Sequence, residues 1–122
     1  MKSSPDTHVS LTSKWFIHPG REEEVFAALE QLARDVQEHE LDTLTYLVHS
    51  PLANGDLQSL PPSDLSSVLF FEVYRSAKAF QAHLNGPIFT KFVEKYGSLF
   101  VPANGKPFVF VEFLARRAGF VR

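Results

Sequence analysis

Cysteine is absent from this chain of 122 residues. The protein therefore forms no disulfide, has no thiolate nucleophile and cannot build a cysteine-based zinc site. Long apolar runs are also missing, since no stretch approaches the roughly 20 residues that a membrane-spanning helix needs. The N-terminus lacks the apolar core of a signal peptide. These absences lead us to expect a cytoplasmic protein with no membrane partner.

Neither sign of charge dominates the sequence. Lys and Arg number 12 and Asp and Glu number 14, which gives a net charge of −2. The two signs are interspersed along the chain. This balance argues against nucleic acid or an anionic membrane surface as a partner.

Several signatures of cofactor and catalytic sites are missing as well. No GxGxxG or GxxxxGK(S/T) motif is present for a nicotinamide, flavin or nucleotide, and there is no HExxH zinc motif or GxSxG nucleophile elbow. No two of the histidines stand at metal-ligand spacing; they are His8, His18, His39, His49 and His83. The sequence therefore predicts neither a metal nor a cofactor.

Phenylalanine is abundant instead. The chain has 12 Phe against one Trp and three Tyr. A chain of this length is expected to form one domain, residues 1–122, that buries roughly two thirds of its unfolded surface. So many aromatic side chains exceed what one modest core needs. The surplus indicates an aromatic-lined cavity or a buried subunit interface.

Hydrophobic periodicity divides the chain into short elements. The predicted strands span 8–18, 43–49, 68–74 and 108–115, and the predicted helices span 22–39, 76–85 and 87–96. Residues 1–7 are expected to be disordered and residues 102–107 to form a turn. Residues 50–67 are rich in Pro, Gly, Ser and Asp and show no periodicity. A loop of that length is either functional or disordered.

The order of these elements, β-α-β-β-α-(α)-β, is that of a ferredoxin-like α+β domain with an antiparallel sheet. Helices cover only one face of such a sheet. Here both faces carry large apolar groups, for example Phe70 and Tyr74 on one and Phe71 and Val73 on the other. A second copy of the chain, packed sheet to sheet as a homodimer, is the economical way to cover the remaining face.

Residues 70–84 carry the most chemical information. The strand Phe-Phe-Glu-Val-Tyr runs into a short helix for which Ser76 is the predicted N-cap. Ala77, Phe80 and Leu84 share one face of that helix, and His83 lies at the edge of the stripe. Glu72, Tyr74 and His83 are therefore expected to lie close together near one edge of the sheet.

This segment resembles the antibiotic biosynthesis monooxygenase (ABM) family, whose members are small dimeric α+β-barrel proteins. They show a glutamate-bearing strand, then an aromatic residue and a histidine on the following helix. The resemblance runs from about His8 to Phe113 and includes the His-Pro-Gly turn at residues 18–20.

The resemblance implies a cofactor-independent oxygenase of secondary metabolism. Such a protein binds an electron-rich phenol, anthrone or hydroquinone and removes a proton, and the resulting anion reacts directly with molecular oxygen. His83 is the candidate base. Glu72 is expected to orient His83 or an arginine, or to pair across the dimer, since a buried charge needs a partner. Tyr74 is a candidate donor to a substrate oxygen.

Other residues are candidates for the cavity wall. They are Ser13, Trp15, Tyr46, Phe70, Phe89, Phe92 and Tyr96. Haem-degrading relatives use an asparagine, a tryptophan and a histidine at positions that fall here on Ser13, His83 and Val93, so haem is not expected. Many relatives also carry a second histidine where this chain has Ile88.

Two alternatives to the oxygenase stay open at this point. A polyketide cyclase or an isomerase on the same fold would also need a base in an aromatic pocket, but would consume no oxygen. A non-catalytic ligand-binding or stress-response dimer would hold a ligand without turnover. Oxygen uptake separates the first alternative from the oxygenase, and any substrate-dependent change separates the second.

Overall fold

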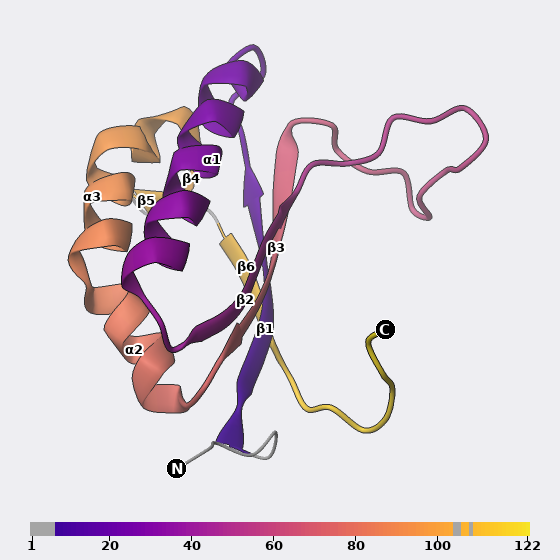
Figure 1. Cartoon of the computed structure of the whole chain (residues 1–122). Coiled ribbons are helices and arrows are strands. Elements are labelled where there is room, and N and C mark those ends of the chain that lie inside the picture. The colour runs from indigo at the N-terminus through magenta and orange to yellow at the C-terminus, as the bar shows by residue number, and fades with distance from the viewer. Residues whose placement is uncertain (1–6, 104–105, 108) are drawn as a thin grey trace.

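The computed structural model describes residues 7–103, 106–107 and 109–122. Its strands and helices follow one another along the chain as labelled in Figure 1. In chain order they are β1 (Val9–Phe16), α1 (Glu22–His39), β2 (Thr43–His49), β3 (Ser67–Tyr74), α2 (Ala77–Asn85), α3 (Pro87–Tyr96), the 3-10 helix η2 (Gly97–Leu99), β4 (Pro102–Ala103), β5 (Lys106–Pro107) and β6 (Val109–Leu114).

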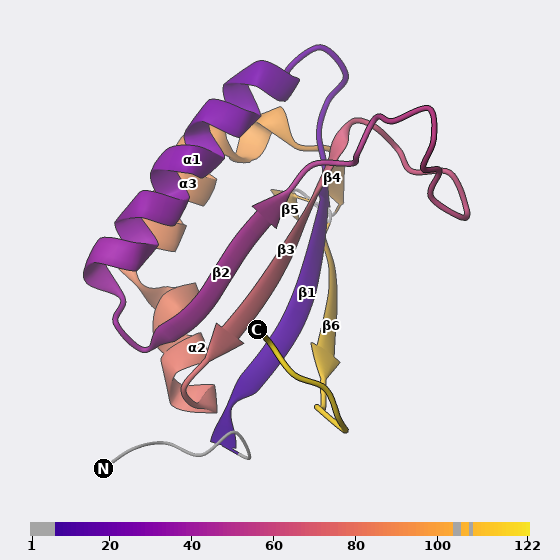
Figure 2. The same cartoon turned by 45° about the vertical axis from the view of Figure 1, so that its right-hand side comes forward.

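The larger sheet has the strand order β2-β3-β1-β6, and every neighbouring pair is antiparallel. The helices lie on one face of this sheet, and the other face stays uncovered (Figures 1 and 2). The predicted ferredoxin-like α+β fold is therefore confirmed. None of the helices within the described residues is long and apolar enough to cross a membrane.

Most predicted boundaries agree with the structure, and α1 and β2 do so at both ends. The predicted turn at 102–107 contains the short pair of β4 and β5. Of the residues expected to be disordered, only Thr7 is described, and its hydroxyl donates to the Arg75 carbonyl at 3.4 Å. Phe108, expected to begin the last strand, lies outside the described residues.

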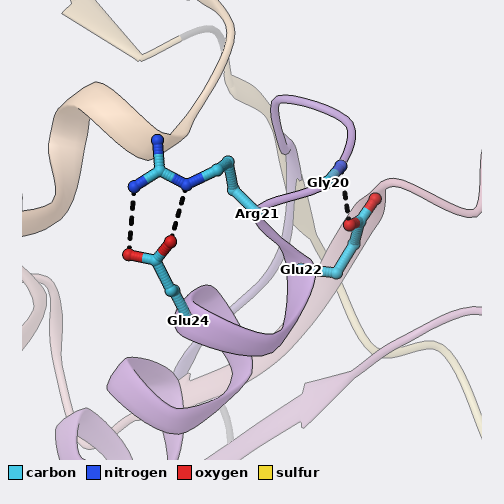
Figure 3. A network of polar contacts seen from close by, with 4 residues as sticks. All are labelled: Gly20, Arg21, Glu22 and Glu24. Carbon is cyan, nitrogen blue, oxygen red and sulfur yellow. Dashed lines mark hydrogen bonds and ion pairs between the residues drawn. The ribbon is translucent and has the colours of Figure 1, made fainter.

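The turn before α1 is fixed by local chemistry (Figure 3). Gly20 has a φ of +93°, a conformation that a residue with a Cβ rarely adopts. Its N–H donates to a carboxylate oxygen of Glu22 at 2.8 Å, and the Arg21 guanidinium donates twice to Glu24, at 2.6 and 3.0 Å. Negative charge in a first helical turn also suits the helix dipole. The start of α1 is thereby held in place.

The core lies between the inner face of the sheet and the helices α1 and α3. Trp15 is central to it, with ring contacts to Phe70, Phe89 and Phe100 at centroid distances of 6.2, 6.1 and 5.0 Å. The apolar face of α1 covers the same layer with residues Val25, Ala28, Leu29, Leu32 and Val36. Alternate residues of β1 and β3 point into this core, as period-2 patterning predicts.

The prediction for the buried face of α2 is confirmed only in part, since Phe80 packs on Tyr74 at a centroid distance of 5.3 Å and lines the cavity with Leu84. Ala77 and Leu84 are exposed, whereas His83, placed at the edge of the stripe by the sequence, is the buried residue of this helix. Ser76 does cap α2, since its hydroxyl accepts from the Ala79 N–H at 3.1 Å. A hydrogen bond to a carboxylate satisfies the buried imidazole, so the helix can turn a polar side chain inward.

The outer face of the sheet is apolar in part and exposed. Leu47, Leu69 and Phe110 point outward from β2, β3 and β6, and between 40% and 57% of each side chain is accessible. Phe16 and Phe110 contact each other there at a centroid distance of 5.8 Å. The expectation of two apolar faces is therefore met.

Candidate functional site

A cavity of about 480 Å³ lies between the inner face of the sheet and the helices α2 and α3. Its wall is mainly apolar, with few polar side chains. It is lined by Leu11, Ser13, Trp15, Tyr46, Phe70, Glu72, Phe80, His83, Leu84, Phe89, Thr90, Val93, Val109 and Val111. This size and lining are typical of a site for a small organic molecule.

His83 is held in a fixed orientation at one side of the cavity. Only 3% of the residue is exposed. Its ring lies 5.5 Å from those of Tyr46 and Tyr74 and 5.1 Å from that of Phe89, centroid to centroid. Its Nδ1 lies 2.6 Å from Oε1 of Glu40. The aromatic rings and the carboxylate together fix the orientation of the imidazole ring.

Glu40 follows α1 directly and caps it, with its backbone N–H donating to the Val36 carbonyl at 2.9 Å. Only 18% of its side chain is exposed. A carboxylate accepts hydrogen bonds, so the proton of the contact with His83 is assigned to Nδ1. In the neutral imidazole the other nitrogen, Nε2, then carries the lone pair.

That second nitrogen faces the cavity. Within the described part of the chain, every fully buried side-chain nitrogen or oxygen has a hydrogen-bond partner. Nε2 of His83 makes no hydrogen bond there, so this atom is not fully buried. Nε2 must therefore reach accessible space, and the space that His83 lines is the cavity. A lone pair on an oriented imidazole at the wall of an apolar cavity is the arrangement of a general base.

A second polar pair lies on β3. The Tyr74 hydroxyl donates to Oε1 of Glu72 at 2.6 Å, and Glu72 is 5% exposed. Burial raises the pKa of Glu72, while the Tyr74 hydrogen bond and the nearby His83 oppose that rise. A buried carboxyl with a raised pKa takes up a proton more readily and can then donate a hydrogen bond.

Tyr46 of β2 also lines the cavity. Burial raises its pKa well above the ordinary value, and the negative charges of Glu72 and Glu40 add to the effect. The phenol therefore stays neutral, and its hydroxyl is available as a donor. Burial likewise raises the pKa of Tyr74, and the charge and hydrogen bond of Glu72 raise it further.

Ser13 and Trp15 of β1 form part of the cavity wall. The Trp15 indole N–H donates to the Ser13 hydroxyl oxygen at 2.8 Å, and both side chains are buried. This bond satisfies the indole nitrogen and fixes the plane of the ring. The wall it provides is flat and aromatic, which suits a planar ligand.

The structure brings most of the predicted site residues to one cavity. Those that line it are Ser13, Trp15, Tyr46, Phe70, Glu72, His83 and Phe89. Tyr74 lies behind this lining, fully buried, with its hydroxyl committed to Glu72 rather than available to a substrate. Phe92 and Tyr96 lie on the side of α3 that faces α1, where they line a separate groove.

Sequence reasoning missed Glu40. The expectation that Glu72 orients His83 is replaced by the observed contact with Glu40, 43 positions away along the chain. One signal was available, because a carboxylate at the C-terminal end of a helix opposes the helix dipole. An acidic residue in such a place needs a compensating partner. Among the described residues, no group of His, Asp and Glu side chains is arranged to hold a metal ion.

Comparison with known proteins places the chain among its relatives. The sequence pattern that defines the family described as antibiotic biosynthesis monooxygenase matches residues 9–95. The chain belongs to this family. The family description supports a monooxygenase-like activity. Among curated protein sequences, none matches this ABM protein.

Solved structures show the same fold at low sequence identity. A candidate antibiotic biosynthesis monooxygenase from Caulobacter crescentus CB15 has a TM-score of 0.73 and 16% identity, with 93% of this chain and 92% of that one covered. A Pseudomonas aeruginosa protein has a TM-score of 0.72 and 21% identity, with 94% and 99% covered. One from Mycobacterium tuberculosis has a TM-score of 0.68 and 19% identity, with 92% and 97% covered. These likenesses concern the fold of the ABM protein.

Proposed function

We propose that this ABM protein is a cofactor-independent monooxygenase that oxidises a small aromatic metabolite of the anthrone or quinol type. The observation that carries the proposal is the placement of His83. Its Nε2 reaches an aromatic cavity while its Nδ1 is held by Glu40 at 2.6 Å. An oriented base in water-poor surroundings is what removal of a weakly acidic proton requires.

The proposed reaction conserves atoms and electrons without a reductant. Nε2 of His83 takes a proton from the substrate CH₂ group, and the carbanion passes one electron to O₂. The two radicals combine into a peroxide anion, which recovers the proton from the imidazolium. Loss of water then breaks the O–O bond and the remaining C–H bond. The net change is CH₂ plus O₂ to C=O plus H₂O.

Other lining residues support the developing charge. The neutral Tyr46 hydroxyl is a donor for a substrate oxygen that gains electron density. Glu72, whose pKa is raised by burial, is a second donor whenever it carries a proton. Trp15, Phe70 and Phe89 provide flat apolar walls. Tyr74 acts through its hydrogen bond to Glu72 rather than on the substrate.

We also propose that the protein works as a homodimer. The uncovered face of the sheet exposes Leu47, Leu69 and Phe110. Large apolar side chains gathered on one uncovered face are unusual in a soluble monomer. A second copy packed on this face would remove it from water.

Oxygen consumption by the purified, metal-stripped protein tests the proposed activity. With a panel of anthrones, naphthols and hydroquinones we expect uptake above the autoxidation rate measured without protein. The variant His83→Ala is expected to fold normally and lose most of the turnover, roughly a hundredfold or more, because a positioned base contributes that much. His49→Ala is the matched control, since His49 is exposed and outside the cavity lining. Unchanged uptake by His83→Ala would rule out the role given to this residue.

A cyclase or isomerase is the second candidate, because an oriented base in an aromatic cavity does not itself require oxygen. Substrate conversion that proceeds at the same rate under nitrogen would favour it. Tight binding of a panel member without any conversion would instead favour a ligand-binding dimer.

A further inference from the structure

Residues 50–66, here called the arm, join β2 to β3 and stand away from the body of the protein (Figures 1 and 2). The arm exposes large apolar side chains to solvent. Leu52, Leu57, Leu60 and Leu65 are between 62% and 88% accessible. None of the arm residues lines the cavity. The arm therefore does not close over the site of its own chain, and its leucines need another explanation.

The arm has defined local structure. The Asn54 side chain accepts from the Asp56 N–H at 2.8 Å, and the Asn54 carbonyl accepts from the Leu57 N–H at 3.3 Å. Such a turn presents the tip in a preferred conformation. Ordering of this kind lowers the entropic cost of binding a partner.

The base of the arm is anchored to the body of the protein. The Ser66 carbonyl accepts from the Ile17 N–H at 2.8 Å, and the Ser66 hydroxyl donates to Glu22 at 2.7 Å. The Ser66 N–H also donates to the Asp64 carboxylate at 2.8 Å. These contacts fix the direction in which the arm leaves the sheet.

That direction is toward the uncovered face of the sheet. In Figure 1 the helices lie on one side of the sheet and the arm extends to the other, and the C-terminal tail also leaves on the arm's side. Figure 2 agrees. The tail exposes Phe120 and Val121 as the arm exposes its leucines. The uncovered face is thus bounded by two projecting segments that carry apolar side chains.

The face itself is suited to a second copy of this chain. Lys14 pairs with Phe110, and Thr12 pairs with Glu112 two positions along. Within the four strands of the larger sheet, two Lys or Glu residues occupy outward positions. They are Lys14 and Glu112, and their charges have opposite signs. In a two-fold arrangement the same patch meets itself, so each Lys14 can lie near the Glu112 of the other copy. The other outward residues of these four strands are Leu, Phe, Val, Ser, Thr and His49, so the formal charges of Lys14 and Glu112 cancel within the strands. Arg116 and Arg117 of the tail lie beside Ser10 and Leu114 at one end of the face.

We propose that the arm of each subunit packs against the second copy that covers the sheet. This contact would bury Leu52, Leu57, Leu60 and Leu65. The inference rests on the proposed homodimer and extends it, because the arm adds an interface that the sheet alone does not supply. It is independent of the proposed reaction.

Replacement of the leucines tests the arm. A variant with Leu52→Ser, Leu57→Ser, Leu60→Ser and Leu65→Ser is compared with the parent by sedimentation equilibrium. We expect the dimer dissociation constant to rise roughly a hundredfold or more, because each leucine contributes substantial apolar area. Leu41→Ser is the control: this residue is 78% exposed but lies outside the arm, and its variant should dimerise like the parent. Since all these side chains are exposed, circular dichroism should show an unchanged fold.

The outcomes separate the two proposals. A parent that is monomeric at every concentration would overturn both the homodimer and the arm, while leaving oxygen uptake unaffected. A dimeric parent whose dissociation constant is unchanged in the arm variant would overturn the arm alone. Loss of a larger assembly with the dimer intact would also overturn it.

The missing cysteine allows a direct location of the contact. Leu60→Cys creates a single thiol in a chain that has none, and a benzophenone maleimide attached there is irradiated. We expect cross-linked dimers whose peptides map to the outward positions of β1, β3 or β6 of the other copy. Leu41→Cys, treated in the same way, should give no cross-linked dimer. Cross-links only within one chain, or to α1 and α3 of a second copy, would contradict the proposal.

Discussion

Single residues of the site differ in what surrounds their ionisable groups. Two carboxyl groups lie near His83: Glu40 bonds its Nδ1, whereas Glu72, which also lines the cavity, accepts from the Tyr74 hydroxyl. Glu40 keeps some contact with solvent and Glu72 almost none. Burial raises the pKa of Glu72, which favours the protonated form of this carboxyl, whereas Glu40 is the residue that anchors the imidazole.

Glu40→Gln should reduce turnover with little change in KM. The amide can donate to Nδ1, which would leave Nε2 protonated and unable to act as a base. We expect kcat to fall by roughly a hundredfold or more, on the scale of lost general-base catalysis. Oxygen-uptake kinetics over a range of pH would show this, and raising the pH should not restore the rate. Glu38→Gln, at an exposed neighbouring position, should behave like the parent. A variant that regains full activity at high pH would contradict the anchoring role.

The stability of the protein should depend on pH through Glu72. Burial raises its pKa in the folded state, so the folded protein binds this proton more tightly than the unfolded chain does. The free energy of unfolding should therefore fall as pH rises from the ordinary carboxyl range, about 4.3, through the raised value. Urea denaturation across that window should show a smaller fall for Glu72→Gln than for the parent. Parallel curves for the two proteins would count against the assignment.

The site could be predicted only where its residues belong to local patterns. His83 and Glu72 were identifiable because a histidine near the end of a short helix and a charge inside an apolar strand are both conspicuous. Glu40 was not, because its contact with His83 joins residues 43 positions apart. The position of Tyr74 depends on how α2 rotates over β3, which strand parity does not determine.

Elements were predictable where their ends carry strong signals. The Pro19-Gly20 turn precedes α1, and Pro87 begins α3 as expected. The face of α2 was not predictable from its apolar spacing. This helix is short, and its orientation is set by the hydrogen bond of His83 and the ring contacts around it rather than by apolar burial alone. Periodicity measures hydrophobicity and contains no information on such polar contacts.

The junction between α2 and α3 should tolerate no side chain at Gly86. A Cβ there would lie 2.7 Å from the Ala82 carbonyl oxygen, although the φ of Gly86 is an ordinary −81°. Gly86→Ala must therefore displace one of the two helices, at a cost of about 1–3 kcal/mol in the free energy of unfolding. Chemical denaturation would measure it. Gly55→Ala is the control, because no atom lies within 4 Å of a Cβ at that position. Equal stability of the two variants would refute the predicted clash.

At the scale of the whole molecule, the sequence predicted the class of fold and the presence of two apolar faces. It did so because strand parity and element order are local properties that add up along the chain. It did not predict where the loop at 50–67 would point or that its leucines would stay exposed, because those depend on how Ser66 is anchored to Ile17 and Glu22. The proposed association with a second copy would account for both the exposed leucines of the arm and the uncovered face of the sheet.

One helix links these separate features. At its first residue, α1 holds the base of the arm through Glu22 and Ser66, and just beyond its last residue it holds the catalytic candidate through Glu40 and His83. An 18-residue helix is about 27 Å long and stiff along its axis. In the proposed dimer, this single rigid element would join the segment that contacts the second copy to the residue that orients the proposed base.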